Sequence, residues 1–370
     1  MNASFTRRHL FYKKGKLVVS VAGVASALTL ILLLMGFRAG LYATLTAFVD
    51  NIGVDLIVAQ SGVQGMFSSN SAVPLDLHER IAGVADAAEA GHILMADLIF
   101  TQDETKTPVL LVGYDPATNF GNPWKIGSGR TIKENNEVVL DTWLAQRAGL
   151  IIGDPVNLLG QQFTLVGLSQ ETSSWMSPYI FVSLDAAEDI LGLSGIVSYH
   201  MIRLPEGTDP EAASLAIEAE IPGVNAMLPD DIAEADRRIL ANIMDSPINV
   251  MLGIGFVIGV AVTGLTSYTA VIDNTRDYGI LKALGASGIR LVRIVIIDTF
   301  YRAALGYIFG TLLAVLAANF IMATWPQFNI LLEPQTVGLA GLLTLLMSMF
   351  SAVLPIQRLN QIDPVMVFKS

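Results

Sequence analysis

Side chains capable of acid–base or metal chemistry are scattered through this sequence of 370 residues. Its four histidines are His9, His78, His92 and His200. None stands at a metal-ligand spacing from another histidine or from paired carboxylates, and the serines of segment 173–177 lack a nucleophile-elbow pattern. Cysteine is absent, so no disulfide, thiolate ligand or cysteine nucleophile can form. We therefore expect neither a catalytic centre nor a metal site.

The chain also lacks the residues for nucleotide chemistry. It contains no G-x-x-x-x-G-K-[ST] loop to hold phosphates, so ATP and Mg²⁺ must belong to a partner if they act at all. Charge is unevenly divided: residues 43–247 hold 9 Lys and Arg against 28 Asp and Glu, and the rest of the chain is basic. We expect no nucleic-acid partner, because phosphate contacts need clustered Lys and Arg.

One polar segment between two long apolar runs has the pattern of a recognition helix. Residues 276–284 can form a short helix in which Ile280, Leu281 and Leu284 stand at helical spacing, and Gly285 would end it. Such a helix either inserts into a groove of a soluble partner or lies in the headgroup region of the membrane. Composition alone leaves both interpretations open.

An acidic and a basic residue stand well inside the third apolar run. Asp298 and Arg302 are four residues apart, so they share one face of a helix. Charges at membrane depth are costly, and they either pair with each other or line a path. We favour an intramembrane ion pair near the cytoplasmic side, with a proton or substrate path as the alternative.

Glycines recur four residues apart in the apolar runs, a spacing that lets helix backbones approach closely. The pairs are Gly36 with Gly40, Gly255 with Gly259, and Gly306 with Gly310. They predict either a dimer seam, through the first or the second run, or packing within one bundle.

The elements that position these residues are four apolar runs, each long enough to cross a bilayer, which takes about 20 residues. They lie at residues 17–37, 250–270, 291–325 and 337–356. The composition, with 52% hydrophobic and 15% charged residues, also indicates a membrane protein, since soluble domains carry about 25% charged residues. The first run is too long for a signal-peptide core, and we expect an uncleaved anchor.

The placement of Lys and Arg predicts the orientation. Basic residues precede the first run, separate the second from the third and follow the fourth, whereas connection 326–335 has none. Short basic segments stay on the cytoplasmic side. We therefore expect a multi-pass protein of the cytoplasmic (inner) membrane with both termini in the cytoplasm.

The predicted division of the chain follows from these signals. It comprises a cytoplasmic amphipathic segment at 1–16, spans at 17–42, 248–274, 289–325 and 336–357, an extracytoplasmic domain at 43–247, a cytoplasmic helix at 275–288, a short outer loop at 326–335 and a cytoplasmic tail at 358–370.

The outer segment alternates short apolar runs with amphipathic stretches, which is typical of a mixed α/β domain. Strands are expected at 55–60, 108–114, 137–140, 155–159, 163–168 and 179–182, and helices at 76–81, 141–149, 184–191 and 210–219. Residues 232–247 are amphipathic and predict either a stalk that leads into the second span or a surface helix. Tyr42 and Asp50, just outside the first span, are candidates for a lateral entrance.

The polar segment resembles the Arg-x-x-Glu-Ile-Gly-x-Leu-Arg-Ala-x-Gly-Ala pattern of FtsX/MacB-like permeases, the membrane subunits of type VII ABC transporters. Asp277 and Tyr278 stand where the family has Glu-Ile. Pro355 to Arg358 and the Asp363-Pro364 motif resemble the family's closing signature, and Gly36-Phe37-Arg38 resembles its small four-span DevC/HrtB-like branch. By this resemblance the ATPase-coupling helix would use Arg276, Asp277, Gly279, Ile280, Leu281, Lys282, Ala283 and Gly285.

The resemblance implies a fold with four transmembrane helices and a MacB periplasmic-core-like α/β domain between the first and second. It implies a homodimer working with two copies of a cytoplasmic ABC ATPase that supplies the ATP and Mg²⁺ chemistry. ATP binding would move the outer domains, a process called mechanotransmission. The cargo would be lipophilic or amphiphilic, such as haem, a glycolipid or a drug-like compound, and an adaptor protein is a further candidate partner.

Other functions remain open at this point. The protein could regulate cell-wall hydrolases or release lipoproteins with the same ATPase partnership. It could instead be a sensor or scaffold with an extracytoplasmic domain, which would not need the helix at 276–284. A membrane enzyme is disfavoured by the lack of a catalytic constellation.

Overall fold

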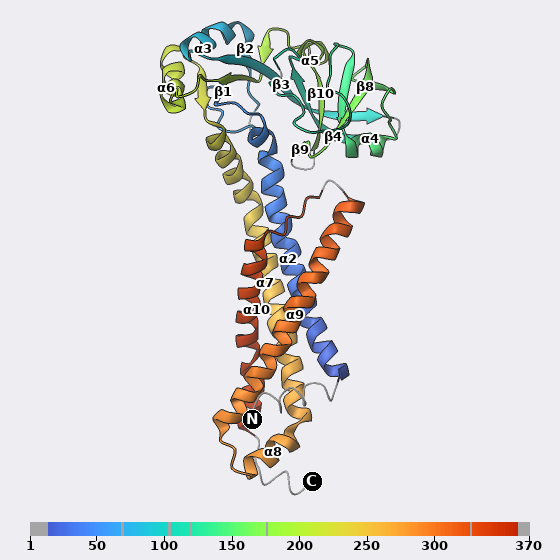
Figure 1. The fold of residues 1–370 in the computed structure, drawn as a ribbon, viewed down its shortest axis with the longest axis vertical. Coiled ribbons are helices and arrows are strands. Elements are labelled where there is room, and N and C mark those ends of the chain that lie inside the picture. Colours follow the sequence, from blue (N-terminus) through green and yellow to red (C-terminus); the bar gives the residue numbers. More distant parts are fainter. Residues whose placement is uncertain are drawn as a thin grey trace. The chain divides into compact units, whose positions relative to one another are not determined.

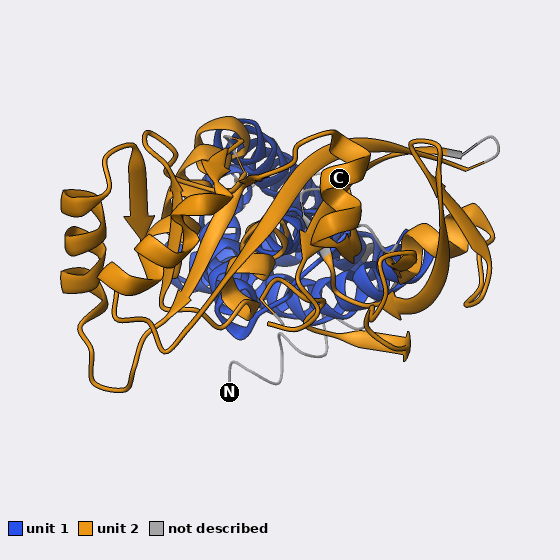
Figure 2. Ribbon diagram, turned by 90° about the horizontal axis from the view of Figure 1, so that it is seen from above, with its two compact units in different colours: residues 1–40, 245–370 blue, residues 41–244 orange. Residues whose placement is uncertain are grey.

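The computed structural model describes residues 14–361, except 68–69, 103–104, 119, 175–176 and 326–327. The chain divides into two compact units, one of residues Met1–Gly40 and Asp245–Ser370 and one of residues Leu41–Met244 (Figure 2). The N-terminal segment 1–13 and the predicted tail from residue 362, with its Asp363-Pro364 motif, lie outside the described residues.

The first unit is helical. In the described part of the chain, four helical stretches are long and apolar enough to cross a membrane. The helices that contribute to this unit are α2 (Lys14–Asn51), α7 (Pro229–Asp273), α8 (Thr275–Ala283), α9 (Gly288–Thr324), α10 (Pro334–Ser351) and α11 (Val353–Asn360) (Figure 1). The four-span part of the predicted fold class is confirmed.

Helices α2 and α7 are much longer than a membrane requires. They have 38 and 45 residues, or about 57 and 68 Å at 1.5 Å per residue, against a hydrocarbon core of about 30 Å. The helix of the first span continues to Asn51, beyond the predicted limit at residue 42. The amphipathic segment 232–247 is likewise no separate element, because α7 runs through Pro247 without a break.

The second unit is built on a mixed sheet of 11 strands in the described residues. Its strands follow the order β13-β1-β12-β3-β4-β10-β6-β8-β5, with β7 beside β8 and β9 beside β10. β10 runs parallel to β4, and β6 runs parallel to β8, while the other pairs are antiparallel. The predicted α/β class of this domain is confirmed.

The bounds of the strands and short helices are as follows. The sheet contains β1 (Leu56–Gln60), β3 (Glu89–Gln102), β4 (Thr105–Tyr114), β5 (Ile126–Gly129), β6 (Glu137–Asp141), β7 (Pro155–Leu158), β8 (Gln161–Ser169), β9 (Ser173–Ser174), β10 (Ser177–Ser183), β12 (Tyr199–Arg203) and β13 (Val224–Met227). A separate pair consists of β2 (Val73–Pro74) and β11 (Ile196–Val197), and the helices are η1 (Leu75–Leu77), α3 (His78–Val84), α4 (Thr142–Ala148), α5 (Leu184–Leu191) and α6 (Pro210–Glu220).

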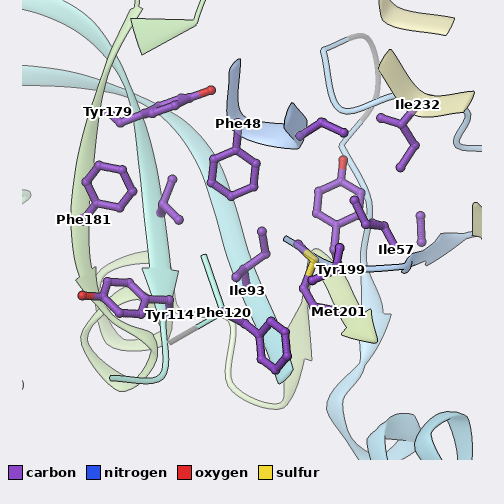
Figure 3. Close-up of a cluster of buried hydrophobic side chains, with 14 of the residues drawn as sticks. Phe48, Ile57, Ile93, Tyr114, Phe120, Tyr179, Phe181, Tyr199, Met201 and Ile232 are labelled. Atoms are coloured by element: carbon purple, nitrogen blue, oxygen red, sulfur yellow. The ribbon is translucent and has the colours of Figure 1, made fainter. Parts of the chain in front are cut away.

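The sheet is covered on both faces, because side chains of one strand alternate between two cores. On β1, Ile57 belongs to an aromatic-rich core shared with Phe48 of α2 and Ile232 of α7 (Figure 3). The neighbouring Leu56 belongs to a second core with Ile217 of α6. In a third core, α4 and α5 cover the part of the sheet that contains β6, β8 and β10.

The short helices begin and end where the sequence offers caps. Asp141 accepts a hydrogen bond from the backbone N–H of Trp143 at 2.9 Å at the start of α4, and Ser183 caps α5 in the same way. Gly149 and Gly192 end these helices with φ of 69° and 66°, the left-handed conformation that glycine adopts without strain.

A buried carboxylate fastens the start of α7 to the second unit. Asp236 is 1% exposed and accepts hydrogen bonds from the backbone N–H groups of Met66 and Phe67, both at 3.1 Å. Gly65 lies so close that a Cβ there would stand 2.1 Å from an oxygen of Asp236. The start of the amphipathic segment therefore packs within the second unit, and the same helix continues into the residues of the second span, whereas its role as a stalk stays a prediction.

Candidate functional site

Helix α8 connects the second and third spans. It begins after Asn274 and ends at Leu284, followed by Gly285 with φ of 86°. A left-handed residue at this place suits glycine and stops the helix. The sequence predicted a helix over nearly the same residues.

One side of α8 is fixed to its own unit. Tyr278 and Leu281 pack against a small core that contains Val271 of α7 and Leu291 of α9, and Gly279 is buried. Burial raises the pKa of Tyr278 to about 12, and the carboxylate of Asp298 adds to this shift. The base of α7, α8 and the start of α9 therefore form one packed assembly.

The other side of α8 is open to a partner. Ile280 and Leu284 are 39% and 80% exposed, and Ile289 at the start of α9 is 84% exposed. Arg276 and Asp277 are also exposed. This arrangement corrects the single apolar stripe expected from spacing, because Leu281 points inward whereas Ile280 and Leu284 point outward.

The remaining residues of the expected coupling set differ in accessibility. Lys282 is half-buried, and Ala283 and Gly285 are exposed. Gly279 is buried, and Leu281 packs against the core beneath α8. These two residues hold the helix in place and do not form the surface that faces a partner. The surface that a partner can reach therefore consists of Arg276, Asp277, Ile280, Ala283, Leu284 and Gly285.

Asp298 and Arg302 lie next to each other on α9. The Nε of Arg302 donates to Oδ2 of Asp298 at 2.9 Å. Arg302 is only 8% exposed and lies on the buried face of α9 that also includes Thr299 and Gly306. This geometry satisfies two charges at membrane depth and favours the structural interpretation of the pair over a path.

The first of these glycine pairs packs closely within the chain, and a dimer seam at these positions stays a prediction. A Cβ on Gly36 would stand 2.8 Å from Leu332, and one on Gly40 would stand 1.8 Å from the backbone of Asn329. These approaches show that both glycines allow the connection 326–335 to lie close to α2.

The second-span glycines differ in how closely they pack. A Cβ on Gly259 would stand 2.8 Å from Met347 of α10 and 3.2 Å from Ala27 of α2, and one on Gly255 would touch Ile31 at 3.4 Å. Close packing inside the bundle accounts for Gly259, whereas the space beside Gly255 would accept a Cβ at ordinary van der Waals distance.

Tyr42 and Asp50 lie on the part of α2 that belongs to the second unit. Thr46 bridges them, because its hydroxyl donates to Asp50 at 2.7 Å and approaches the carbonyl oxygen of Tyr42 at 3.4 Å. Arg237 of α7 donates to the same hydroxyl at 3.3 Å. These contacts join α2 to α7, and an entrance for cargo stays a prediction.

A cavity of about 170 Å³ lies in the second unit, lined by residues that include Met95, Asp97 and Tyr199. Pockets for drug-sized ligands usually have about 300–1,000 Å³. This cavity is therefore too small to enclose such a compound.

Three histidines that are far apart in the sequence meet in the second unit. Ring nitrogens of His78, His92 and His200 all lie within 4.8 Å of one another. The prediction of no metal site relied on spacing along the chain, and spacing does not show side chains that strand pairing brings together. The pairing of β3 with β12 brings His92 and His200 together. The sequence analysis could not anticipate the cluster, because it predicted neither strand.

Comparison with known proteins covers both units. Residues 17–220 match the MacB-like periplasmic core domain, and residues 249–364 match the FtsX-like permease C-terminal domain. An ABC transporter permease of Mycobacterium tuberculosis is 23% identical over an alignment of 374 positions, which covers 98% of this chain and 97% of the relative. One from Methanocaldococcus jannaschii is 25% identical over an alignment of 182 positions, which covers 46% of this chain and 45% of the relative.

Solved structures also resemble the outer domain. The periplasmic region of MacB from Actinobacillus actinomycetemcomitans is 12% identical, with a TM-score of 0.39, and the match covers 50% of this chain and 94% of that one. The extracellular domain of the transporter YknZ from Gram-positive bacteria is 12% identical, with a TM-score of 0.36, and the match covers 47% of this chain and 98% of that one.

The first domain match covers more than half of the chain, and the second covers most of the remainder. In the structure, as in these two matches, the α/β domain precedes the second, third and fourth spans. The chain therefore belongs to the family of multi-pass ABC transporter permeases with a MacB-like periplasmic core and an FtsX-like C-terminal domain.

Proposed function

We propose that this permease is the membrane subunit of an ATP-driven exporter that works by mechanotransmission. A cytoplasmic ABC ATPase would bind α8, and two copies of each subunit would form the complex, with both termini of the permease in the cytoplasm. The observation that supports this most directly is the connection of α8 to α7. Only Asn274 separates α8 from α7, the continuous helix that reaches the outer domain.

The two sides of α8 suit a lever. Tyr278 and Leu281 fasten α8 to the base of α7, while Ile280 and Leu284 remain exposed. Exposed apolar residues flanked by Arg276 and Asp277 can fill a groove on a soluble partner. A push on α8 would therefore be transmitted to α7 and to the domain that holds Asp236.

We further propose a lipophilic or amphiphilic cargo. In the described residues of α9, the charged groups at membrane depth are Asp298 and Arg302, and they neutralise each other. The cavity lined by Met95, Asp97 and Tyr199 is smaller than a typical pocket for a drug-sized compound. These features favour a cargo that moves along the apolar surface of the helices, and haem, glycolipids and drug-like compounds have the required character.

Mild-detergent purification from native membranes tests the ATPase partnership. We expect an ABC ATPase to co-purify in equal amount. Replacement of both Ile280 and Leu284 by Glu should abolish this association, because charge would enter the apolar groove. The matched control is Leu215→Glu, which changes a 67% exposed leucine of α6 in the other unit.

The outcome separates the proposed functions. An ATPase that is retained by the control and lost from the α8 variant supports a permease that is driven through α8, as the exporter requires. A well-folded permease that never carries an ATPase contradicts the proposal and leaves a sensor or scaffold. Substituting Gly279 would be less informative, because that glycine is buried and a larger side chain would disturb the fold.

A further inference from the structure

The three-histidine cluster of the second unit is formed by strand pairing and by the start of a helix. His92 of β3 and His200 of β12 are directly opposite each other on adjacent antiparallel strands. Side chains at such a pair point to the same face of the sheet. His78 is the first residue of α3, which lies near β3 in Figure 1, and it approaches the same face.

The distances suit a metal ion. Nδ1 of His78 and Nδ1 of His200 are 3.4 Å apart. Tetrahedral Zn²⁺ with bonds to nitrogen of about 2.0–2.1 Å places its ligand nitrogens about 3.4 Å apart. The rings of His78 and His92 have centroids 4.9 Å apart, and one ring nitrogen of His92 lies within 4.8 Å of a ring nitrogen of each of the other two histidines.

The hydrogen bonds leave lone pairs directed into the cluster. Nε2 of His200 lies 3.3 Å from the carbonyl oxygen of Pro74, which can only accept, so this nitrogen carries the proton. The Nδ1 of neutral His200 then presents its lone pair toward His78. Metal-binding histidines typically donate their second N–H to a carbonyl in this way.

His92 contributes a second, independent observation. Its Nδ1 is buried and has no hydrogen-bond partner among the described residues. A buried polar atom without a partner usually costs free energy, and a bound ion is one of the ordinary explanations. A hydrogen bond between His78 and His200 alone would leave this nitrogen unexplained.

The donor atoms decide which metals fit this cluster. Imidazole nitrogens suit Zn²⁺ and its neighbours Cu²⁺ and Ni²⁺, whereas Mg²⁺ and Ca²⁺ prefer oxygen.

We propose that His78, His92 and His200 bind a divalent transition-metal ion of the Zn²⁺ class, with the fourth position open to water or an exogenous ligand. The ion would join α3 to strands β3 and β12. It would therefore stabilise the outer domain, because ligands from three separate segments must be brought together by folding. Nothing in this proposal depends on the ATPase partner.

The test uses the full-length protein in detergent after treatment with a chelator. Titration with Co²⁺ should give one bound ion per chain and the strong visible absorption of a tetrahedral site, and Zn²⁺ should displace it. Zn²⁺ should also raise the unfolding temperature, whereas Mg²⁺ should not, because a ligand that binds the folded state stabilises it.

The variants identify the ligands. His78→Gln and His92→Gln change half-buried side chains, and each should weaken Zn²⁺ binding by about 100-fold or more, since even partners of ligands are worth about 10–100-fold. His9→Gln is the matched control and should keep full affinity. After chelator treatment, the variants should unfold at nearly the same temperature as the chelator-treated unaltered chain. This result would show that the substitutions weaken metal binding and leave the fold intact.

Two results would overturn the proposal. One is that the unaltered chain shows no tetrahedral Co²⁺ absorption, a result that does not depend on any variant. The other is that His78→Gln and His92→Gln bind Zn²⁺ as tightly as His9→Gln does, which would place the ion elsewhere.

Discussion

Asp298 and Arg302 illustrate how a charge at membrane depth depends on its partner. Replacing Asp298 by Asn leaves the guanidinium of Arg302, which is 8% exposed, without its carboxylate. Breaking a buried pair by removing one member is strongly destabilising, by about 3–5 kcal/mol. We expect Asp298→Asn to lower the yield of folded protein more than the double change Asp298→Asn, Arg302→Gln.

Yield and monodispersity in detergent measure this difference, with a substitution of the exposed Phe300 by Leu as a control on the same helix. Equal defects in the single and double variants would argue against a structural pair and revive the idea of a path.

A second residue makes the stability of the outer domain depend on pH. Asp141 is buried, and burial raises its pKa from 3.8 to about 6 although Thr172 and the N–H of Trp143 donate to it. The folded state therefore holds this proton more tightly than the unfolded state. The free energy of unfolding should fall as the pH rises from about 4 to 6, by about 3 kcal/mol in total.

Asp141→Asn tests this assignment. Asparagine also caps helices and stays neutral, so the decline in stability between pH 4 and 6 should become smaller. Thermal unfolding of the full chain across this pH range is the measurement. An unchanged profile would assign the pH dependence to other groups.

At the scale of elements, the two sides of α8 differ, because one packs on a core and the other is exposed. Leu281→Ala removes part of a half-buried side chain in the core beneath α8 and should lower the free energy of unfolding by about 1–2 kcal/mol. Ile280→Ala, on the outer side, should leave stability nearly unchanged. A chemical-denaturation series of both variants checks this, and similar losses would show that both side chains are packed.

The elements that sequence analysis predicted well are those with strong local signals. The expected strands at 55–60, 137–140 and 155–159 correspond to β1, β6 and β7, and the helices that end at Gly149 and Gly192 were expected from the same glycines. Each has a compact apolar run or a cap, so local residues are enough to specify it.

Strands β3 and β12 were missed for a physical reason. β3 contains Gly91 and Asp97 and shows no clear alternation, and the apolar run of β12 is interrupted by His200. Their strand conformation depends on neighbours, since β3 pairs with both β12 and β4. The histidine cluster was missed with them, because two of its members lie on these strands.

The candidate coupling site was predictable in position but not in orientation. Spacing placed Ile280, Leu281 and Leu284 together on a helix, yet a helix of nine residues has a core-facing side that only its neighbours determine. The packing of Leu281 on the base of α7 and the start of α9 decides which side remains for a partner.

At the scale of the whole molecule, the absence of cysteine offers a direct test of orientation. Single cysteines at exposed Ala212 of α6 and exposed Ala283 of α8 give matched reporters. In intact cells, a membrane-impermeant maleimide should label Ala212→Cys, and Ala283→Cys should react only after lysis. The opposite labelling pattern would invert the orientation predicted from the basic segments.

The second unit is also one uninterrupted insertion, between Gly40 and Asp245 of the first. The two ends that flank it are close together, because Nη1 of Arg38 lies 3.9 Å from Oδ1 of Asp245. Insertions are tolerated best where the host's ends are already adjacent. The outer domain is thus a module that evolution or an engineer could exchange, with a short connector or a foreign domain in its place, while the order of the spans stays the same.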